Sequence, residues 1–213
     1  MSETAPRDRY GLALLLLIGS VLVFAVTDHS AFGRVLLLAT QGLTVVVVFH
    51  ASRLPRRTQR GAIAVIALLV IASSVSAVTG GEGWLWTPAA VGATLVLAAP
   101  VAIVRRLREH RQINFSTVLG ALCLYILGGL AFAYAYMLIG DLGGEPFFGQ
   151  VAQGRPVDFV YFSFVTLATL GYGDLTPAGD TGRMLAITET VLGQLYLVGA
   201  VAAIVSNLGR VRE

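Results

Sequence analysis

The segment TLATLGYGDLTP, from Thr166 to Pro177, places two closely spaced glycines, a tyrosine and an aspartate just before the last long apolar run of the chain. Gly171 and Gly173 can take left-handed backbone conformations without a Cβ penalty, so this short run suits a non-helical path. Non-helical backbone at membrane depth is tolerated only where protein shields it or where it faces water. In a membrane protein, residues Thr169–Gly173 are therefore expected to line an aqueous path.

A short helix is predicted directly before this segment, after a loop rich in glycine and proline over residues 141–156. Residues 157–168 would make only about three helical turns, too few to cross a hydrocarbon core of ~30 Å. Pro156 suits the first turn because its missing N–H would have had no partner there, and Asp158 adds negative charge at the positive end of the helix dipole. This helix is expected to enter the membrane and return, with its C-terminal end pointing inward.

The composition is that of an integral membrane protein. The 213 residues are 56% hydrophobic and 13% charged, with a mean hydropathy of +0.78, whereas about a quarter of the residues of a soluble domain are charged. Cys123 is the only cysteine and is expected to be an apolar packing residue. His29, His50 and His110 sit at span ends, too scattered for a metal site, and no motif supports an enzyme or a resident cofactor.

Six apolar segments are long enough to cross the hydrocarbon core. They are Tyr10–Val26, Val35–Ala51, Gly61–Val78, Pro88–Val104, Ile113–Ile139 and Met184–Leu208. All fifteen basic residues are arginine, and twelve of them fall on the same side as both termini. The positive-inside rule therefore predicts a multi-pass protein of the cell membrane with both termini in the cytoplasm. The net charge of +3 reflects this topology, and no basic stripe with stacking aromatics suggests nucleic-acid binding.

A known family matches the glycine-containing run. The residues Thr169, Leu170, Gly171, Tyr172 and Gly173 resemble the selectivity filter of tetrameric potassium channels, with Leu170 in place of the more usual valine and Asp174 following, as in many members. The resemblance implies that the carbonyls of residues 169–172 coordinate K⁺, the permeant ion, and that the Thr169 hydroxyl supplies the innermost oxygens. It also implies that Tyr172 turns its ring away from the axis, where Tyr161 and Phe162 pack against it.

The same resemblance implies a complete pore domain over residues 113–213. Its parts are an outer helix at 113–139, a pore helix at 157–168, a filter at 169–173 and an inner helix at 184–208. Residues 1–112 form a four-span N-terminal membrane domain. Because each chain has one filter, three identical chains are expected as partners in a homotetramer. Pro88–Val104 contains no Arg or Lys, so the fourth span lacks the arginine ladder of a voltage sensor.

The predicted inner helix contains two glycines that are gating candidates, Gly193 and Gly199. Gly193 lies twenty residues after Gly173, the spacing at which family members often have a hinge glycine, and glycine lowers the cost of bending a helix. The alternative is that both glycines allow close packing against the outer span. Cavity-facing positions are proposed at Gln194 and Leu197, with the inner mouth narrowed further on by two valines, Val201 and Val205.

Two acids near the filter are expected to support it. Glu189 lies well inside the inner span, so it should be protonated or hydrogen-bonded to the back of the pore helix near Thr166 or Ser163, as a structural partner or as a proton sensor. Some family members pair Asp174 with a Glu of the pore helix, but Val165 occupies that position. A hydroxyl contact from Tyr161 is expected to hold Asp174 instead.

A cluster of arginines follows the fourth span. It is expected to anchor the topology and connect to the pore, with contact to anionic lipid as the alternative role; its members are Arg105, Arg106, Arg108 and Arg111. The whole pattern predicts an all-α, six-span, potassium-selective channel that conducts passively as a homotetramer, without a voltage sensor. The alternatives are a weakly selective cation channel and a subunit of a potassium transporter. No gating stimulus is predicted.

Overall fold

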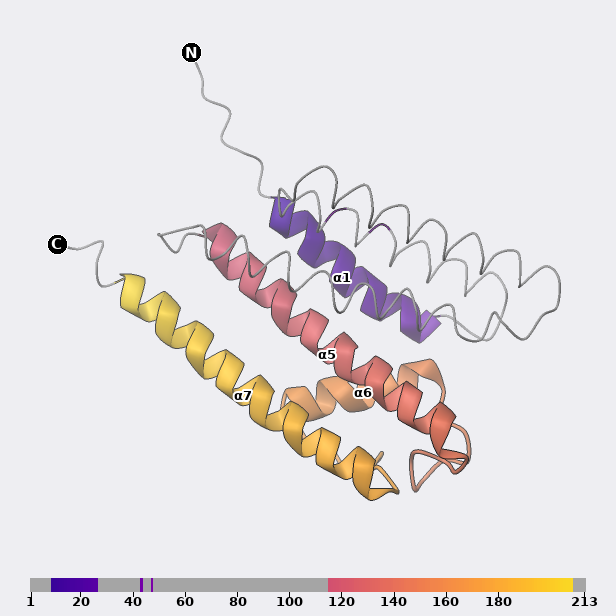
Figure 1. Ribbon diagram of the computed structural model, residues 1–213. Coiled ribbons are helices and arrows are strands. Elements are labelled where there is room, and N and C mark those ends of the chain that lie inside the picture. The colour runs from indigo at the N-terminus through magenta and orange to yellow at the C-terminus, as the bar shows by residue number, and fades with distance from the viewer. Residues whose placement is uncertain (1–8, 27–42, 44–46, 48–114, 209–213) are drawn as a thin grey trace, which may run out of the picture.

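The structure, a computed structural model, describes residues 9–26, 43, 47 and 115–208. Predictions for the second, third and fourth spans and for the arginine cluster at 105–111 lie outside the described residues, apart from the two isolated positions 43 and 47. The described part is all-helical, as predicted, and one isolated β-bridge joins Phe148 to Pro177 within it. Its helices are α1 (Arg9–Val26), α5 (Phe115–Gly143), α6 (Pro156–Leu167) and α7 (Asp180–Leu208) (Figure 1).

Two of these helices, α5 and α7, are long and apolar enough to cross a membrane, and each has 29 residues. They extend past the predicted bounds, since α5 continues beyond Ile139 to Gly143 and α7 begins before Met184 at Asp180. The predicted bounds followed the apolar runs, whereas a helix ends where its backbone is capped. Gly144, with a φ of 67°, has the left-handed conformation that often ends a helix. Asp180 places an acid in the first turn of α7, which the helix dipole favours.

The short helix α6 packs against both long helices (Figure 1). α5 and α7 run in opposite directions, and α1 lies along α5 on the side away from α7. α6 therefore has its surroundings set by two long apolar helices, which also fix where its C-terminal end lies.

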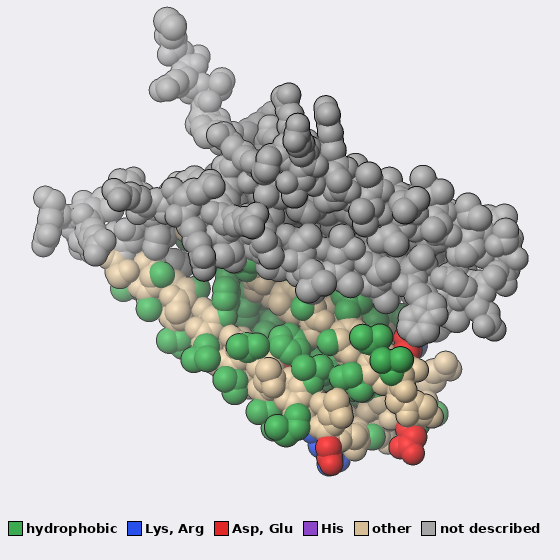
Figure 2. All heavy atoms as spheres, in the orientation of Figure 1, with side chains coloured by type: hydrophobic (Ala, Val, Ile, Leu, Met, Phe, Trp, Pro, Cys, Tyr) green, Lys and Arg blue, Asp and Glu red, His purple; other side chains and the backbone are tan. Residues whose placement is uncertain are grey.

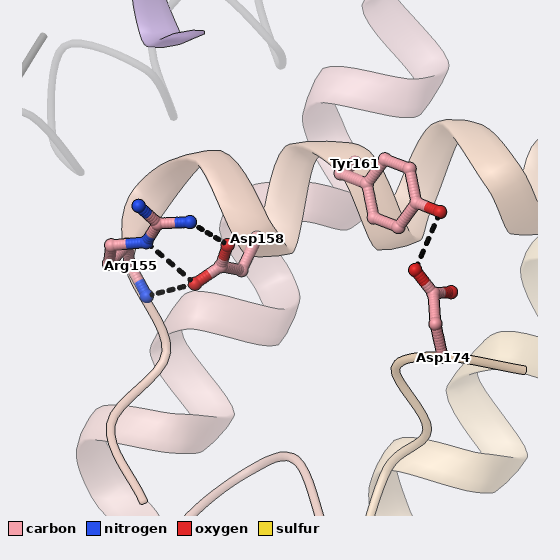
Figure 3. A network of polar contacts seen from close by, with 4 residues as sticks. All are labelled: Arg155, Asp158, Tyr161 and Asp174. Carbon is pink, nitrogen blue, oxygen red and sulfur yellow. Dashed lines mark hydrogen bonds and ion pairs between the residues drawn. The ribbon is translucent and has the colours of Figure 1, made fainter. Parts of the chain in front are cut away.

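An ionic cap starts α6 one residue earlier than predicted. Arg155 is the extended N-cap residue and Pro156 is the first helical residue. The Arg155 backbone N–H donates to Asp158 Oδ2 at 2.8 Å, and the guanidinium donates to both oxygens of the same carboxylate at 3.2 and 2.9 Å (Figure 3). Burial alone would raise the pKa of Asp158, but the hydrogen bonds from Arg155 and its positive charge outweigh this and lower the pKa below its ordinary value. The carboxylate therefore stays ionised at the positive end of α6.

A buried aromatic cluster fixes the back of α6. Its members, each at most 8% exposed, are Tyr136, Phe147, Phe148, Phe159 and Phe162. The rings of Tyr136 and Phe162 meet edge to face with centroids 5.0 Å apart, and Phe148 lies 4.9 Å from both Phe147 and Phe159. Such pairs contribute about 0.5–1.5 kcal/mol beyond the burial of their area. The cluster joins α5, the loop before α6 and α6 itself, and so holds α6 at a set distance from α5.

The loop before α6 is also tied to the chain just after the glycine-containing run. The Gly149 N–H donates to the Thr176 carbonyl at 3.1 Å, and the Ala178 N–H donates to the Phe147 carbonyl at 2.8 Å. The Gln150 side chain adds two hydrogen bonds to this contact. Its amide N–H donates to Thr176 Oγ1 at 2.7 Å, and its oxygen accepts from the Thr176 N–H at 2.9 Å. Both ends of residues 169–173 are thus anchored, at α6 on one side and at this loop on the other.

Candidate ion-binding site

The backbone of residues 169–173 alternates in hand. Thr169, Gly171 and Gly173 have φ values of 57°, 58° and 78°, while the two residues between them do not have positive φ. Within the described residues, no hydrogen bond is made to any carbonyl oxygen of residues 169–172. Alternation of left- and right-handed backbone lets successive carbonyls point to one side. The segment therefore presents a row of carbonyl oxygens that protein donors have left free.

The positive φ of Thr169 was not foreseen from the sequence, and it follows from how α6 ends. The Thr169 N–H donates to the Thr166 carbonyl at 3.0 Å, and the Leu170 N–H donates to the Val165 carbonyl at 2.9 Å. This pair of bonds is the Schellman motif, which requires a left-handed residue directly after the helix cap. Glycine is usual at that position, and a left-handed conformation costs a residue with a Cβ about 1–2 kcal/mol. The helix end thus imposes the first left-handed residue, and the two glycines continue the alternation.

Two side chains missed by the sequence analysis hold the same helix end. The Tyr125 hydroxyl of α5 donates to the Leu167 carbonyl at 3.1 Å, which satisfies one of the last free carbonyls of α6. The Tyr196 hydroxyl of α7 donates to the Ala121 carbonyl of α5 at 2.6 Å, and the two tyrosine rings stack with centroids 6.1 Å apart. Their only sequence signal was a polar tip at an apolar helix position, which does not say which carbonyl it reaches.

Asp174 is held by a side chain of α6. The Tyr161 hydroxyl donates to Asp174 Oδ2 at 2.8 Å, which is the contact expected for Asp174 (Figure 3). Phe162 does not accompany Tyr161, because its ring contacts are with Tyr136, Phe147 and Phe148. Within the described residues Tyr172 has no ring contact with either, so the expectation that Phe162 packs against Tyr172 is corrected. Consecutive residues point about 100° apart on a helix, so Tyr161 and Phe162 cannot face the same side.

Glu189 of α7 is fully buried where α5, α6 and α7 meet. Its Oε1 lies 2.5 Å from Ser163 Oγ, and the Tyr136 hydroxyl donates to its Oε2 at 2.6 Å. Of the two partners considered from the sequence, Ser163 is the one in contact and Thr166 is not. Ser163 Oγ also lies 2.6 Å from the Gly129 carbonyl of α5. One carboxyl group therefore connects all three helices behind the row of carbonyls.

Gly193 packs against the end of α6. A Cβ at this position would lie 2.7 Å from Leu167 Cδ1 and 3.2 Å from the Leu167 carbonyl oxygen. At Gly199, by contrast, a Cβ would meet no atom of the described residues within 4 Å. Gly193 thus allows α7 to approach the last residue of α6, and at Gly199 the alternative of close packing on the outer span has no support within the described chain.

The residues beyond Gly193 separate into two faces of α7. Gln194 is exposed in the single chain, and its Nε2 lies 3.4 Å from Thr169 Oγ1, next to the first residue of the alternating run. Val201 and Val205 are also exposed, but Leu197 is half-buried. Val198, 65% exposed, shares a face with Gln194 at the i, i+4 spacing of a helix. Val198 is therefore a further candidate for a cavity-facing position, and the assignments of Gln194, Leu197, Val201 and Val205 stay predictions.

The alternating run lies open on the surface of the single chain. Leu170 is 56% exposed and Tyr172 is 66% exposed. Large apolar side chains are also exposed along α7, and Figure 2 shows them as green patches over the described helices; they include Met184, Ile187, Val191, Leu192, Leu195 and Val198. Of the membrane-crossing window of α7 only 11% is buried, compared with 39% for α5. Within the described residues, α7 and the alternating run both have exposed, largely apolar surfaces.

Comparison with known proteins places this arrangement in a class. Residues 120–210, which contain α6, the alternating run and α7, match the family described as ion channel. The chain is 33% identical over 90 residues, 41% of its length, to the inward rectifier potassium channel Kirbac3.1 of Paramagnetospirillum magnetotacticum, covering 28% of that protein. It is 29% identical over 109 residues, 51% of its length, to two pore potassium channel a of Oryza sativa subsp. japonica, covering 29% of it.

A third relative is the protein LctB of Geobacillus stearothermophilus, 40% identical over 78 residues, which are 34% of this chain and 56% of that protein. The chain spans less than two thirds of the length of each of these relatives. No solved structure matches it. Residues 120–210 of this chain are thus similar to an ion channel family, and two of these relatives are potassium channels, which supports the resemblance found in Thr169–Gly173.

Proposed function

We propose that this protein is a potassium-selective channel that conducts passively through a homotetrameric pore, with one filter strand from each chain. The observation that carries the proposal is the row of free carbonyls at residues 169–172, set by left-handed backbone at Thr169, Gly171 and Gly173. Rings of such oxygens replace the hydration shell of K⁺. The names of the potassium channel relatives support the choice of ion.

One chain provides only one strand of carbonyl oxygens, which can line one side of an ion path but cannot surround an ion. This supports a tetramer. Four strands are needed to surround an ion, and Leu170 and Tyr172 are exposed where further strands would pack. The exposed apolar side of α7 supplies a surface that neighbouring chains and lipid would cover. The C-terminal end of α6, with its partial negative charge, meets the inner end of the row at Thr169, which favours a cation there.

The remaining assignments follow the same geometry. In the tetramer Gln194 would sit below Thr169, and Val198, Val201 and Val205 would line the path towards the inner mouth. The six-span layout, the re-entrant course of α6 and the cytoplasmic location of both termini are part of the proposal. It also includes the absence of a voltage sensor and an anionic-lipid contact at Arg105, Arg106, Arg108 and Arg111.

The test is the reversal potential of purified protein in planar bilayers, with K⁺ on one side and Na⁺ on the other. A reversal potential displaced strongly in the direction of K⁺ permeation supports a selective, passive pore. A value close to zero with measurable current would instead identify the weakly selective cation channel, which Leu170 in place of valine makes the main alternative. Uphill K⁺ movement in vesicles, without single-channel currents, would identify the transporter subunit.

A further inference from the structure

The buried carboxyl group of Glu189 belongs to a chain of hydrogen bonds whose protons can be counted. Four oxygen-bearing groups take part: the Tyr136 hydroxyl, the Glu189 carboxyl, the Ser163 hydroxyl and the Gly129 carbonyl. The successive oxygen–oxygen distances are 2.6, 2.5 and 2.6 Å, all short enough to require a proton between the two atoms. Glu189 and Ser163 are both 0% exposed, so water cannot supply a missing donor.

The Gly129 carbonyl can only accept, so the proton in its contact comes from Ser163. A serine hydroxyl carries a single proton, and that proton is then used. The contact between Ser163 Oγ and Glu189 Oε1 still needs one, and only the carboxyl group is left to provide it. An ionised Glu189 would take the serine proton, and the Gly129 carbonyl and Ser163 Oγ would face each other at 2.6 Å with lone pairs alone.

The charges around Glu189 agree with this count. Neither ion pair among the described residues includes Glu189. Among the described residues, the titratable groups that face it are two tyrosines of α5, Tyr136 in direct contact and Tyr125 within electrostatic reach. From α6 it meets the uncharged Ser163. An ionised carboxylate inside a membrane helix with no cation beside it is strongly disfavoured.

We propose that Glu189 is a neutral carboxylic acid whose proton holds α6 against α7, and that removal of this proton at alkaline pH loosens the filter and reduces K⁺ current. The functional part rests on the proposed channel function. The hydrogen bonds run in one direction, from Tyr136 to Glu189, from Glu189 to Ser163 and from Ser163 to Gly129. Glu189 is a positioning residue, because it touches the back of α6 and not the ion path.

A second contact one turn further along each helix explains how the filter would respond. Leu167 follows Ser163 by four residues on α6, and Gly193 follows Glu189 by four on α7, so both pairs lie on the same α6–α7 seam. Leu167 is two residues before Thr169, where the alternating run begins. Separation of Ser163 from an ionised Glu189 would therefore shift the helix end that sets the φ of Thr169.

The experiment uses the full-length protein and Glu189→Gln, whose amide keeps every hydrogen-bond direction: its N–H₂ donates to Ser163, its oxygen accepts from Tyr136, and it cannot ionise. The matched control is Glu145→Gln, which removes an exposed carboxyl group from the loop after α5. Infrared difference spectra at neutral pH should show the C=O band of a protonated acid in the wild type, lost in Glu189→Gln and retained in Glu145→Gln. The band does not depend on conduction, so it tests the proton even if the channel function is wrong.

The second part of the experiment measures K⁺ current in bilayers from neutral to strongly alkaline pH. We expect a fall of about tenfold or more in the wild type and in Glu145→Gln, and a flat profile in Glu189→Gln. Both tyrosines remain in Glu189→Gln. A fall in K⁺ current that persists in this variant would therefore come from Tyr125 or Tyr136, and it would overturn the proposal that deprotonation of Glu189 reduces the current. Absence of the protonated-acid band in the wild type at neutral pH would overturn the proton assignment itself.

Ser163→Ala should lower current at all pH values, and a Ser163→Ala profile equal to that of the wild type would also contradict the proposal.

Discussion

At the scale of single residues, the site depends on backbone conformations that most side chains resist. Gly171 and Gly173 have φ values of 58° and 78°, and nothing lies within 4 Å of where their Cβ atoms would be. A Cβ atom would therefore fit at either position in the single chain. What disfavours a substitution is the left-handed backbone conformation, which residues with a Cβ rarely adopt. Thr169 adopts the same hand despite its Cβ, because the Schellman bonds at the end of α6 impose it.

Replacement of Gly171 or Gly173 by alanine is expected to abolish or strongly degrade K⁺ selectivity. A Cβ makes the left-handed backbone less favourable by about 1–2 kcal/mol in each chain, and four chains add this cost at one ring of the filter. The measurement is the K⁺/Na⁺ permeability ratio in bilayers. The matched control is Gly128→Ala in α5, where the φ is not positive and a Cβ meets nothing within 4 Å. Permeability ratios in both filter variants equal to that of the control would remove the filter assignment.

At the scale of helices, α6 is held by contacts on both sides. The aromatic cluster and Tyr125 attach it to α5, while Glu189 and Gly193 attach it to α7. The position of the filter thus depends on the spacing of three helices, and a change in the α6–α7 distance reaches Thr169 through Leu167. This gives Gly193 a different role from that of a simple hinge.

Gly193→Ala is expected to lower K⁺ selectivity as well as to change open probability. Its Cβ would lie 2.7 Å from Leu167 Cδ1 and 3.2 Å from the Leu167 carbonyl oxygen, so α6 and α7 must move apart. Overpacking of this kind costs about 1–3 kcal/mol. Single-channel recording gives both quantities. Leu167→Ala in the same chain removes the Cδ1 contact and should restore part of the selectivity.

Gly199→Ala is the control for this experiment, since its Cβ would meet no described atom within 4 Å. A changed open probability with intact selectivity in Gly193→Ala, and no effect of the second substitution at Leu167, would show that Gly193 acts as a hinge. That result would restore the prediction made from its spacing after Gly173.

At the scale of the whole molecule, the described part of one chain does not enclose the alternating run. The alternating run is exposed, and the apolar side of α7 lacks partners within the described chain. Four copies arranged around the run would complete the coordination of an ion, and two or three would leave part of it open to water. The subunit number is therefore a direct test of the site geometry.

Native mass spectrometry of the detergent-purified protein is expected to give a mass of four chains of 22.5 kDa each. K⁺ in the buffer should raise the temperature at which the tetramer dissociates compared with Na⁺, because an ion bound only by the assembled filter stabilises it. A stable dimer or monomer, or equal stability in both salts, would contradict a four-chain K⁺ filter.

Local features of this protein were determined by its sequence alone. The left-handed conformations of Gly171 and Gly173, the place of Pro156 and Asp158 in the first turn of α6, and the apolar lengths of α5 and α7 each depend on residues within a few positions of one another. Glycine spacing, a proline at a helix start and a long apolar run have the same physical effect in almost any surroundings. These signals were enough to identify a filter-like run between two membrane-crossing helices.

The tertiary structure decided which faces of distant segments meet. Phe162 packs into the aromatic cluster and not on Tyr172, Gly193 contacts α6, and the carboxyl group of Glu189 contacts side chains of both α5 and α6. Each of these depends on helix rotation and spacing, which are set by packing between residues 26 to 53 positions apart, such as Ser163 with Glu189 and Tyr136 with Glu189. A helix with apolar residues on all sides, as a membrane helix has, gives no periodic signal for its orientation, so only the packed structure could assign these partners.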